Sequence, residues 1–423
     1  MRNVIATLFT IIFSVSNFLA QDTLSVLFIG NSYTSANNLP LLVQSLSSSA
    51  GKTLNIDSNM PGGYLLSGHL NDATTFSKIS QGNWDYVILQ EQSQIPTIDF
   101  YRYNDMYPAM TELKALIEQY NPCARVITYM TWGRRFGGQQ CDPSGSNCSP
   151  VFSEFNHMQD SLTSAYTEIS SLLKVQCAPV GVTWQNILND TTLVLHSGDN
   201  SHPNIDGSYV AALSLYSSIW KLPAMGLSYN AGISAERATY YQSQSDITLF
   251  GLPNQWDLYI NTPTANFNFQ NVGNAVNFTN LSVSNVNNTL NYKVNFGDGT
   301  TSNDQNPTHT YSSNGTYTVT LIATDCIFTD TISMQVNALA ALEDHTESSF
   351  LVYPNPTANV ITVTQESNYI GASYTLMNNI GNKVLEGQLN TSKTSIDLSM
   401  LAKGIYFLSL GDKNNEAIKV VIE

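Results

Sequence analysis

Strand-like and helix-like segments alternate through residues 22–250, and this alternation limits the possible fold more than any other feature. Short apolar runs at residues 24–29, 86–89 and 125–130 are typical of buried strands, and segments with a helical period follow them. Repeated strand–helix units form a parallel sheet that helices cover on both faces, with ligands at the carboxyl ends of the strands. We therefore predict an α/β domain over residues 22–250.

The pattern changes after about residue 260, where the helical period disappears. Short alternating strands separated by turns with Asn and Gly take its place. They predict two all-β domains, over residues 262–338 and 350–423, joined by a linker at residues 339–349. A chain of 423 residues is long enough for three domains of ordinary size.

The charge balance bears on the partners of the protein. The chain has 32 Asp and Glu against 17 Lys and Arg, which gives a formal net charge of −15. Such an excess of negative charge argues against nucleic acid or an anionic membrane as the main partner.

The N-terminus has the features of a secretory signal peptide. Arg2 precedes an apolar run at residues 4–13, and the small residue Ala20 stands at the expected cleavage point. Phe18 departs from the small-residue rule, which leaves the position of the cut open. We predict a signal peptide over residues 1–20, no transmembrane segment elsewhere, and an exported mature protein.

Five cysteines fit an oxidising compartment. Cys141 and Cys148 flank a polar loop, and we expect a disulfide between them. Cys123 and Cys177 each precede an apolar strand, which would allow a second bridge and leave Cys326 unpaired. The spacings match no zinc site, and we expect no metal.

A candidate nucleophile follows the first strand. The apolar run at residues 24–29 ends in the turn Gly-Asn-Ser (30–32), and a helix-like segment follows at residues 39–46. A serine on such a turn exposes its hydroxyl at the carboxyl edge of the sheet, near a helix N-terminus that favours negative charge. Ser32 is therefore the candidate, and a serine that only caps a helix is the alternative.

A candidate base and its partner precede the last helix-like run of the domain, at residues 208–220. Asp199 and His202 are three residues apart, so one short turn can place the carboxylate against the imidazole. A serine nucleophile needs a base, and the base needs a partner that fixes its tautomer. We predict a triad of Ser32, His202 and Asp199.

The motifs Gly-Asn-Ser (30–32) and Asp-x-x-His-Pro (199–203) resemble the first and last blocks of the SGNH (GDSL-like) hydrolase superfamily. The resemblance implies a three-layer α/β/α, flavodoxin-like parallel sheet. It also implies a serine esterase that works through an acyl-enzyme and needs no metal or organic cofactor. The family has an aspartate where this chain has Asn31.

The resemblance also implies hydrogen-bond donors for the oxyanion that forms during acyl transfer. The Ser32 N–H is the first candidate. The family's second block supplies a glycine N–H, which corresponds here to Gly63, with Gly62 as the alternative. The third block is Asn-Asp in the family but Gln-Glu-Gln here, so we expect the side-chain amide of Gln90, or else Gln92, to donate.

Four further residues are candidates for substrate binding. Trp132, Arg134 and Arg135 follow the fourth strand, on the expected rim of the site, where a tryptophan could stack on a sugar. A Trp that covers a helix and arginines that face solvent are equally good interpretations. His69 is the fourth candidate, with a packing role as the alternative.

The C-terminal segments carry two further resemblances. The motifs at residues 292–299 (Tyr-Lys-Val-Asn-Phe-Gly-Asp-Gly) and 307–311 (Pro-Thr-His-Thr-Tyr) resemble a PKD domain, an Ig-like β-sandwich. The motifs at residues 353–356 (Tyr-Pro-Asn-Pro) and 401–406 (Leu-Ala-Lys-Gly-Ile-Tyr) resemble the type A C-terminal sorting domain of the type IX secretion system, which we also expect to be an Ig-like sandwich. This resemblance implies the type IX machinery as a partner and a location outside the cell or on its outer membrane.

These features predict a secreted serine esterase that hydrolyses O-acyl esters, above all O-acetyl esters, of a small molecule or a polysaccharide. The alternative is a cell-surface carbohydrate-binding or adhesion protein with a weakly active hydrolase domain, because Asn31 and Gln90 depart from the family pattern. A lipase is the third interpretation, but no segment of the sequence has the character of an apolar lid.

Overall fold

The computed structural model describes residues 19–20, 22–189, 192–260, 262–272, 275–284, 290–338, 350–365, 370–410 and 417–423. The chain divides into two compact units, residues 1–339 and 340–423. The predicted signal peptide, apart from β1 (Leu19–Ala20), and the predicted linker lie outside the described residues. Within the described ranges, no helix has the length and apolar character that a membrane span requires.

The first part of the larger unit is built on a five-stranded parallel sheet in the order β3-β2-β4-β5-β6. In chain order this is 2-1-3-4-5, the predicted flavodoxin-like arrangement. Strands β4 and β5 are buried throughout, as expected for central strands covered on both faces. The strands are β2 (Thr23–Ile29), β3 (Thr53–Asn59), β4 (Tyr86–Leu89), β5 (Arg125–Tyr129) and β6 (Gln176–Ala178).

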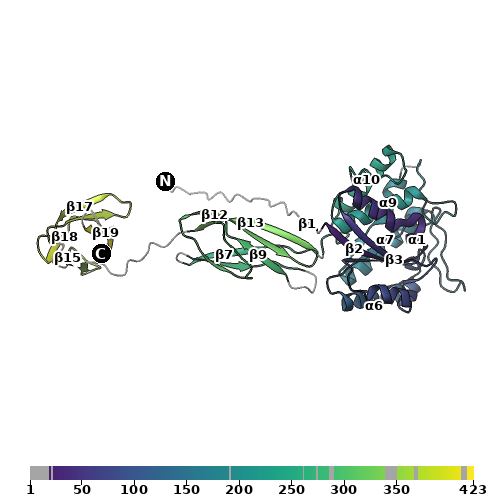
Figure 1. Ribbon diagram of the computed structural model, residues 1–423, viewed down its shortest axis with the longest axis horizontal. Coiled ribbons are helices and arrows are strands. Elements are labelled where there is room, and N and C mark those ends of the chain that lie inside the picture. Colours follow the sequence, from purple (N-terminus) through teal and green to yellow (C-terminus); the bar gives the residue numbers. More distant parts are fainter. Residues whose placement is uncertain are drawn as a thin grey trace. The chain divides into compact units, whose positions relative to one another are not determined.

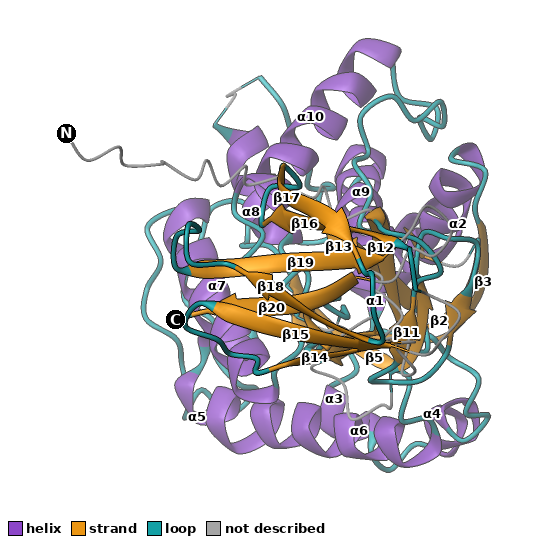
Figure 2. Ribbon diagram, turned by 90° about the vertical axis from the view of Figure 1, so that its left-hand side faces the viewer, coloured by secondary structure: helices purple, strands orange, loops and turns teal. Residues whose placement is uncertain are grey.

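Successive residues of each strand point to opposite faces of the sheet and enter two separate cores. Val26 and Phe28 belong to the first core, whereas Leu27 and Ile29 belong to the second. Figures 1 and 2 show α9 and α10 on one side of the sheet and α6 on the other, which confirms the predicted three layers. The first core includes side chains of α2 (Leu39–Ser49), α8 (Val180–Leu188), α9 (Ile205–Trp220) and α10 (Ala235–Gly251). The second includes side chains of α3 (Leu66–His69), α4 (Ala73–Ile79), α6 (Tyr107–Tyr120) and α7 (Phe155–Leu173).

Short helical turns lie in two of the loops that follow strands. They are α1 (Ser32–Ser35), η1 (Ala36–Asn38), η2 (Ile95–Thr97), α5 (Asp99–Tyr101) and η3 (Arg102–Met106).

The second part of the larger unit consists of two antiparallel sheets, β1-β13-β12-β9-β10 and β11-β8-β7. Alternate residues such as Val319 and Leu321 enter one apolar core, as expected for an Ig-like sandwich. The strands are β7 (Phe267–Val272), β8 (Ala275–Asn280), β9 (Asn291–Asn295), β10 (Thr301–Ser302), β11 (Thr308–Thr310), β12 (Gly315–Thr324) and β13 (Phe328–Ala338).

The smaller unit also consists of two antiparallel sheets, β14-β15-β18 and β17-β16-β19-β20. Its own core includes Ile361, Val363 and Leu408, so it too agrees with the predicted all-β sandwich. The strands are β14 (Phe350–Tyr353), β15 (Val360–Gln365), β16 (Ser373–Asn378), β17 (Lys383–Gln388), β18 (Lys393–Asp397), β19 (Gly404–Leu410) and β20 (Ala417–Ile422).

Two disulfides form, and one of them differs from the prediction. Cys141 pairs with Cys148 as expected. Cys123, however, pairs with Cys326 and not with Cys177. The turn between β12 and β13 brings Cys326 to the start of β5, whereas Cys177 is 1% exposed within β6 and packs in the second core. The α/β part and the sandwich part of the larger unit are therefore covalently joined.

Candidate active site

Ser32 lies between the end of β2 and the body of α2, at the carboxyl edge of the sheet. Helix α1 begins at Ser32, and Asn31 caps it, because the Asn31 Oδ1 accepts a hydrogen bond from the Tyr33 N–H at 3.1 Å. The Ser32 N–H is the first of the helix and therefore has no acceptor within it. This N–H is well placed to meet negative charge that develops beside the Ser32 hydroxyl.

The structure brings Ser32, His202 and Asp199 together across 170 residues of chain. The His202 Nε2 lies 2.9 Å from the Ser32 Oγ, and the His202 Nδ1 lies 2.5 Å from the Asp199 Oδ2. An ionised carboxylate can only accept, so Nδ1 carries the proton of the neutral ring. The His202 Nε2 is then free to accept the proton of the Ser32 hydroxyl.

Asp199 is held in its ionised form by hydrogen bonds. Partial burial works against ionisation, but donors at both carboxylate oxygens outweigh it and lower the pKa of Asp199 well below its usual value. The Asp199 Oδ1 accepts from the N–H groups of Ser201 and His202 at 3.0 and 2.9 Å and from the Ser197 hydroxyl at 3.1 Å. The Asp199 Oδ2 accepts from the His202 ring.

The segment at residues 196–203 is closed by its own backbone. The Ser197 N–H donates to the His202 carbonyl at 2.8 Å, and Asn200 takes a left-handed φ of 58°. A β-bridge joins the two ends of the segment. This tight turn explains how a spacing of three residues brings the Asp199 carboxylate to the His202 ring.

Gln90 is fully buried and braces the turn that carries Ser32. Its Oε1 accepts from the Asn31 N–H at 3.0 Å and from the Thr34 hydroxyl at 2.7 Å. Only the amide oxygen can accept these bonds, which directs the Nε2 to the Glu91 carbonyl. Both ends of the Gln90 amide are thus engaged by the protein, in contrast to the oxyanion role that we expected.

The other expected donors lie in loops at the same edge of the sheet. Gly63 is exposed, with a left-handed φ of 66°, next to Gly62 in a turn that ends at Tyr64. The Asn31 Nδ2 donates to the Tyr64 carbonyl at 2.9 Å, which ties this turn to the turn of Ser32. Gln92 is half-buried after β4, and no described residue accepts from its Nε2. Gly63 and Gln92 remain candidates for the oxyanion hole.

His69 packs inside the protein and has no free ring nitrogen. Its Nε2 lies 2.9 Å from the Gly30 carbonyl and therefore donates, so its Nδ1 accepts from the Thr75 hydroxyl at 2.7 Å. Burial lowers the pKa of His69, which favours this neutral form. The packing alternative thus fits His69 better than a contact with substrate.

Trp132 is 0% exposed, so its ring is not available to stack on a sugar, and the packing interpretation fits it better. Its ring lies between those of Tyr33 and Trp184, with centroid separations of 4.8 and 4.1 Å. Its Nε1 donates to the Ser201 carbonyl at 2.9 Å. Trp132 therefore helps to hold the turn that carries His202.

Arg134 stays a candidate for substrate binding. It is half-buried, its Nη2 lies 3.5 Å from the Ser93 Oγ, and its buried Nε has no partner among the described residues. The next residue, Arg135, donates from its N–H to the Asn200 carbonyl at 3.0 Å and packs its guanidinium against Phe136. Phe136 is 67% exposed. The segment at residues 134–136 thus borders the turn that holds His202.

Sequence reasoning missed two residues that support the site. Tyr33 bonds to Ser201, and its ring lies edge-on to His202. Glu91 is fully buried, and its Oε1 accepts from the N–H groups of Gln92 and Leu66, which links the two loops that carry the candidate oxyanion donors. Burial raises the pKa of Glu91 to about 8. In the sequence, the one indication of a supporting role for Tyr33 and Glu91 is that each stands next to a residue of a motif.

A bound metal ion needs several ligating side chains close together. Among the described residues, no group of three or more His, Cys, Asp or Glu side chains is arranged to hold a metal ion.

Two family models match the C-terminal part of the chain. Residues 261–336 match the PKD domain, and residues 351–423 match the secretion system C-terminal sorting domain. The second match indicates type IX secretion to the cell surface or the extracellular space. Among curated proteins, Beta-agarase A of Zobellia galactanivorans is 33% identical over 95 residues, which are 22% of this chain. The match spans only 17% of the length of that relative.

Solved structures resemble the N-terminal part of the chain. A candidate SGNH hydrolase from Slackia heliotrinireducens is 23% identical, with 47% of this chain and 99% of that chain covered and a TM-score of 0.37. A DUF4886 family protein from Bacteroides uniformis is 17% identical (55% and 96% covered, TM-score 0.46). A variant of Axe2, an acetyl-xylooligosaccharide esterase from a Geobacillus species, is 14% identical (45% and 92% covered, TM-score 0.34). Behind its α/β part, the chain thus carries segments that match a PKD domain (residues 261–336) and a secretion system C-terminal sorting domain (residues 351–423).

Proposed function

We propose that this protein is an exported serine esterase with Ser32, His202 and Asp199 as its catalytic triad. One observation carries the proposal: the His202 ring bonds to the Ser32 hydroxyl through Nε2 and to the Asp199 carboxylate through Nδ1. A hydroxyl, an imidazole and an oriented carboxylate in this order form the arrangement that activates a serine for acyl transfer.

In the proposed reaction, the Ser32 Oγ attacks the ester carbonyl carbon while its proton moves to the His202 Nε2. The N–H groups of Ser32 and Gly63, with the Gln92 amide in place of Gln90, stabilise the oxyanion. The imidazolium, held by the ionised Asp199, then gives its proton to the leaving alcohol. Water, activated by His202 in the same way, hydrolyses the acyl-enzyme and releases the acid.

We further propose that the substrate is an O-acyl ester, in particular an O-acetyl ester, on a polysaccharide. The rim beside the turn of His202 supports this, because Arg134, Arg135 and the exposed Phe136 offer hydrogen-bond donors and an apolar ring side by side. Sugars are bound by this combination of polar groups and aromatic faces. Export by the sorting domain also suits a substrate outside the cell.

Labelling with a fluorophosphonate, followed by peptide mass mapping, tests the nucleophile. We expect one covalent adduct, on the peptide that contains Ser32, and loss of acetate release from acetylated xylan in step with labelling. If unlabelled protein releases octanoate from its p-nitrophenyl ester but no acetate from acetylated xylan, and labelling abolishes the octanoate release, the enzyme is a lipase. If neither labelling nor hydrolysis occurs, the carbohydrate-binding alternative replaces the esterase.

A further inference from the structure

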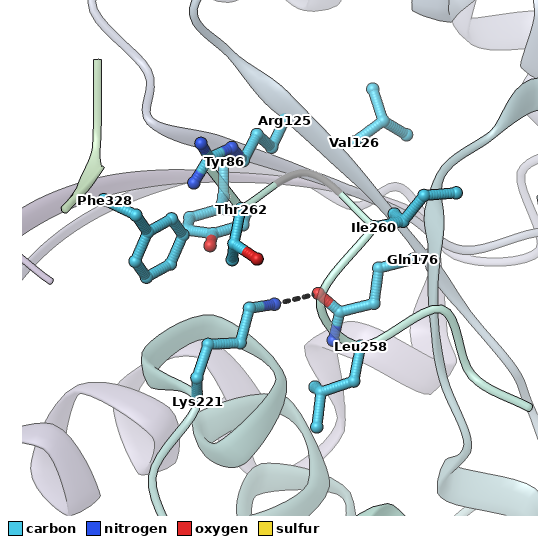
Figure 3. A pocket seen from close by; sticks show the side chains of 9 residues that line it. All are labelled: Tyr86, Arg125, Val126, Gln176, Lys221, Leu258, Ile260, Thr262 and Phe328. Atoms are coloured by element: carbon cyan, nitrogen blue, oxygen red, sulfur yellow. Dashed lines mark hydrogen bonds between the residues drawn. The ribbon is translucent and has the colours of Figure 1, made fainter. Parts of the chain in front are cut away.

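A small cavity lies at the opposite edge of the sheet, where the strands begin (Figure 3). Tyr86, Arg125 and Gln176 are the first residues of β4, β5 and β6, and Lys221 follows the last residue of α9. Phe328, the first residue of β13, reaches the cavity from the sandwich. The centre of a water-sized sphere can occupy about 10 Å³ of the cavity, so the cavity has room for one small molecule or ion.

The side chains around the cavity carry two positive charges and no negative charge. Figure 3 shows Arg125 and Lys221 entering from opposite sides. Asp325 pairs with the Arg125 Nη2 at 2.5 Å from outside the lining, and its other oxygen accepts from the N–H groups of Ile327 and Phe328. The charge of Asp85 also acts on Arg125, whereas no described carboxylate is bonded to Lys221, so the excess positive charge at the cavity is that of Lys221.

Hydrogen-bond donors at the cavity outnumber their acceptors. The buried Arg125 Nε and Nη1, the Gln176 Nε2 and the Tyr86 Oη have no partner among the described residues. Arg125, Gln176 and Tyr86 are 4%, 3% and 1% exposed, so solvent cannot satisfy these atoms. The Lys221 ammonium donates to the Gln176 Oε1 and to the Ser218 carbonyl at 2.7 Å, which leaves its third proton available.

We propose that this cavity binds one small monovalent anion of the size of chloride, held by Arg125, Lys221, Gln176 and Tyr86. A water molecule accepts two hydrogen bonds and leaves the excess charge in place, whereas a halide accepts from several donors and neutralises it. The volume excludes sulfate, phosphate and carboxylates. Burial and the neighbouring Arg125 lower the pKa of Lys221, and the anion counteracts both effects.

The anion would act on the junction between the α/β part and the sandwich. Arg125 belongs to β5, while its partners Asp325 and Phe328 belong to the sandwich, with the Cys123–Cys326 disulfide beside them. A ligand that binds only the folded junction shifts the unfolding equilibrium toward the native state by mass action. The stability of the larger unit should therefore depend on halide concentration.

The test compares unfolding of the full chain in sodium chloride and in sodium gluconate at equal ionic strength. Gluconate carries the same charge but is too large for the cavity, so general salt effects cancel. We expect the unfolding equilibrium constant to fall about tenfold when chloride reaches ten times its Kd. Lys221→Met should abolish this difference, whereas Lys174→Met should keep it, because Lys174 is an exposed residue that also follows a helix in a left-handed conformation. Gln176→Glu supplies a carboxylate to the cavity and should make stability independent of chloride even if Lys221→Met does not fold.

Crystals grown in sodium bromide give the direct readout. We expect one anomalous peak in the cavity, in contact with the Arg125 and Lys221 side chains. Equal stability of the wild type in chloride and gluconate, or a cavity without bromide signal, would overturn the proposal. A full chloride effect in Gln176→Glu would also contradict it.

Discussion

The hydroxyl of Tyr33, which follows the nucleophile candidate, lies 2.5 Å from the hydroxyl of Ser201, which precedes the base candidate. The two residues are 168 positions apart in the chain. The Tyr33 ring also lies edge-on to His202, with 5.2 Å between ring centroids. One side chain on the turn of Ser32 therefore sets the distance to the turn of His202.

Replacing Tyr33 by Phe removes this bond and keeps the stacking on Trp132. We expect kcat to fall about 2- to 10-fold with KM unchanged, because a hydrogen bond of this kind contributes about 0.5–1.5 kcal/mol. The matched control is Tyr103→Phe, since Tyr103 is an exposed tyrosine with a long contact to Glu168. An unchanged kcat in Tyr33→Phe would show that the contact does not position His202.

The two glutamines after β4 should have different roles. Gln92→Leu should lower kcat about 10²- to 10³-fold without loss of stability, as removal of an oxyanion donor does. Gln90→Leu should lower the free energy of unfolding by about 1–3 kcal/mol, because it leaves the buried Asn31 N–H without an acceptor. Chemical denaturation measures the stability of both variants, and steady-state kinetics measures their kcat. A large fall in kcat in Gln90→Leu, with a loss of stability in Gln92→Leu, would support Gln90 as the oxyanion donor.

Trp132 should act through packing and not through substrate contact. Trp132→Phe should lower the melting temperature, since it removes the bond to the Ser201 carbonyl and part of the buried stack. The KM for acetylated xylo-oligosaccharides should stay the same. A tenfold rise in KM with an unchanged melting temperature would instead support Trp132 as a sugar platform.

Glu91 should make the protein less stable as the pH rises. Burial raises the pKa of Glu91 to about 8 from an unfolded value of about 4.5, so the native state binds more protons between these two values. The stabilising contribution of protonated Glu91 is complete below about pH 4.5 and is lost as the pH rises toward 8. Glu91→Gln should flatten this part of the stability–pH curve, whereas exposed Glu112→Gln should not. Equal slopes in Glu91→Gln and the wild type would contradict the assignment.

Thiol titration tests the disulfide pattern. Native protein should react with no thiol reagent, because the remaining cysteine, Cys177, is buried and burial raises its pKa to about 12. Unfolding without reductant should expose one thiol per chain. Three thiols per chain would mean that one of the two bridges does not form.

Local patterns in the sequence predicted the parallel α/β sheet, and the resemblance to SGNH hydrolases implied its strand order; the same local patterns led to the proposed triad. The apolar runs mark the strands, and every strand of a parallel sheet ends at the same edge, so Ser32 and the turn of His202 had to meet there. Asp199 and His202 also needed only one short turn between them. The strands and the Asp199–His202 pair could thus be predicted from hydrophobic periodicity and residue spacing, which are visible in the sequence.

The roles of Trp132, His69, Gln90 and Cys123 depended on packing that no local pattern records. A tryptophan after a strand can face either the solvent or the core, and here the ring of Tyr33 covers it. Gln90 has the right amide in the right loop, but the Asn31 N–H takes its oxygen. Cys123 pairs with Cys326 because the sandwich contacts the start of β5. This contact joins residues about 200 positions apart, which a local pattern cannot indicate.

The central claim is that Ser32 is the nucleophile, and the most direct test is kcat/KM for p-nitrophenyl acetate with wild type, Ser32→Ala and Ser35→Ala. Ser35 is an exposed serine on the same helix and serves as the control. We expect an active wild type, a loss of about 10³-fold or more in Ser32→Ala, and wild-type activity in Ser35→Ala. Ser32→Ala activity within tenfold of the wild type, or a wild type without activity, would contradict the account.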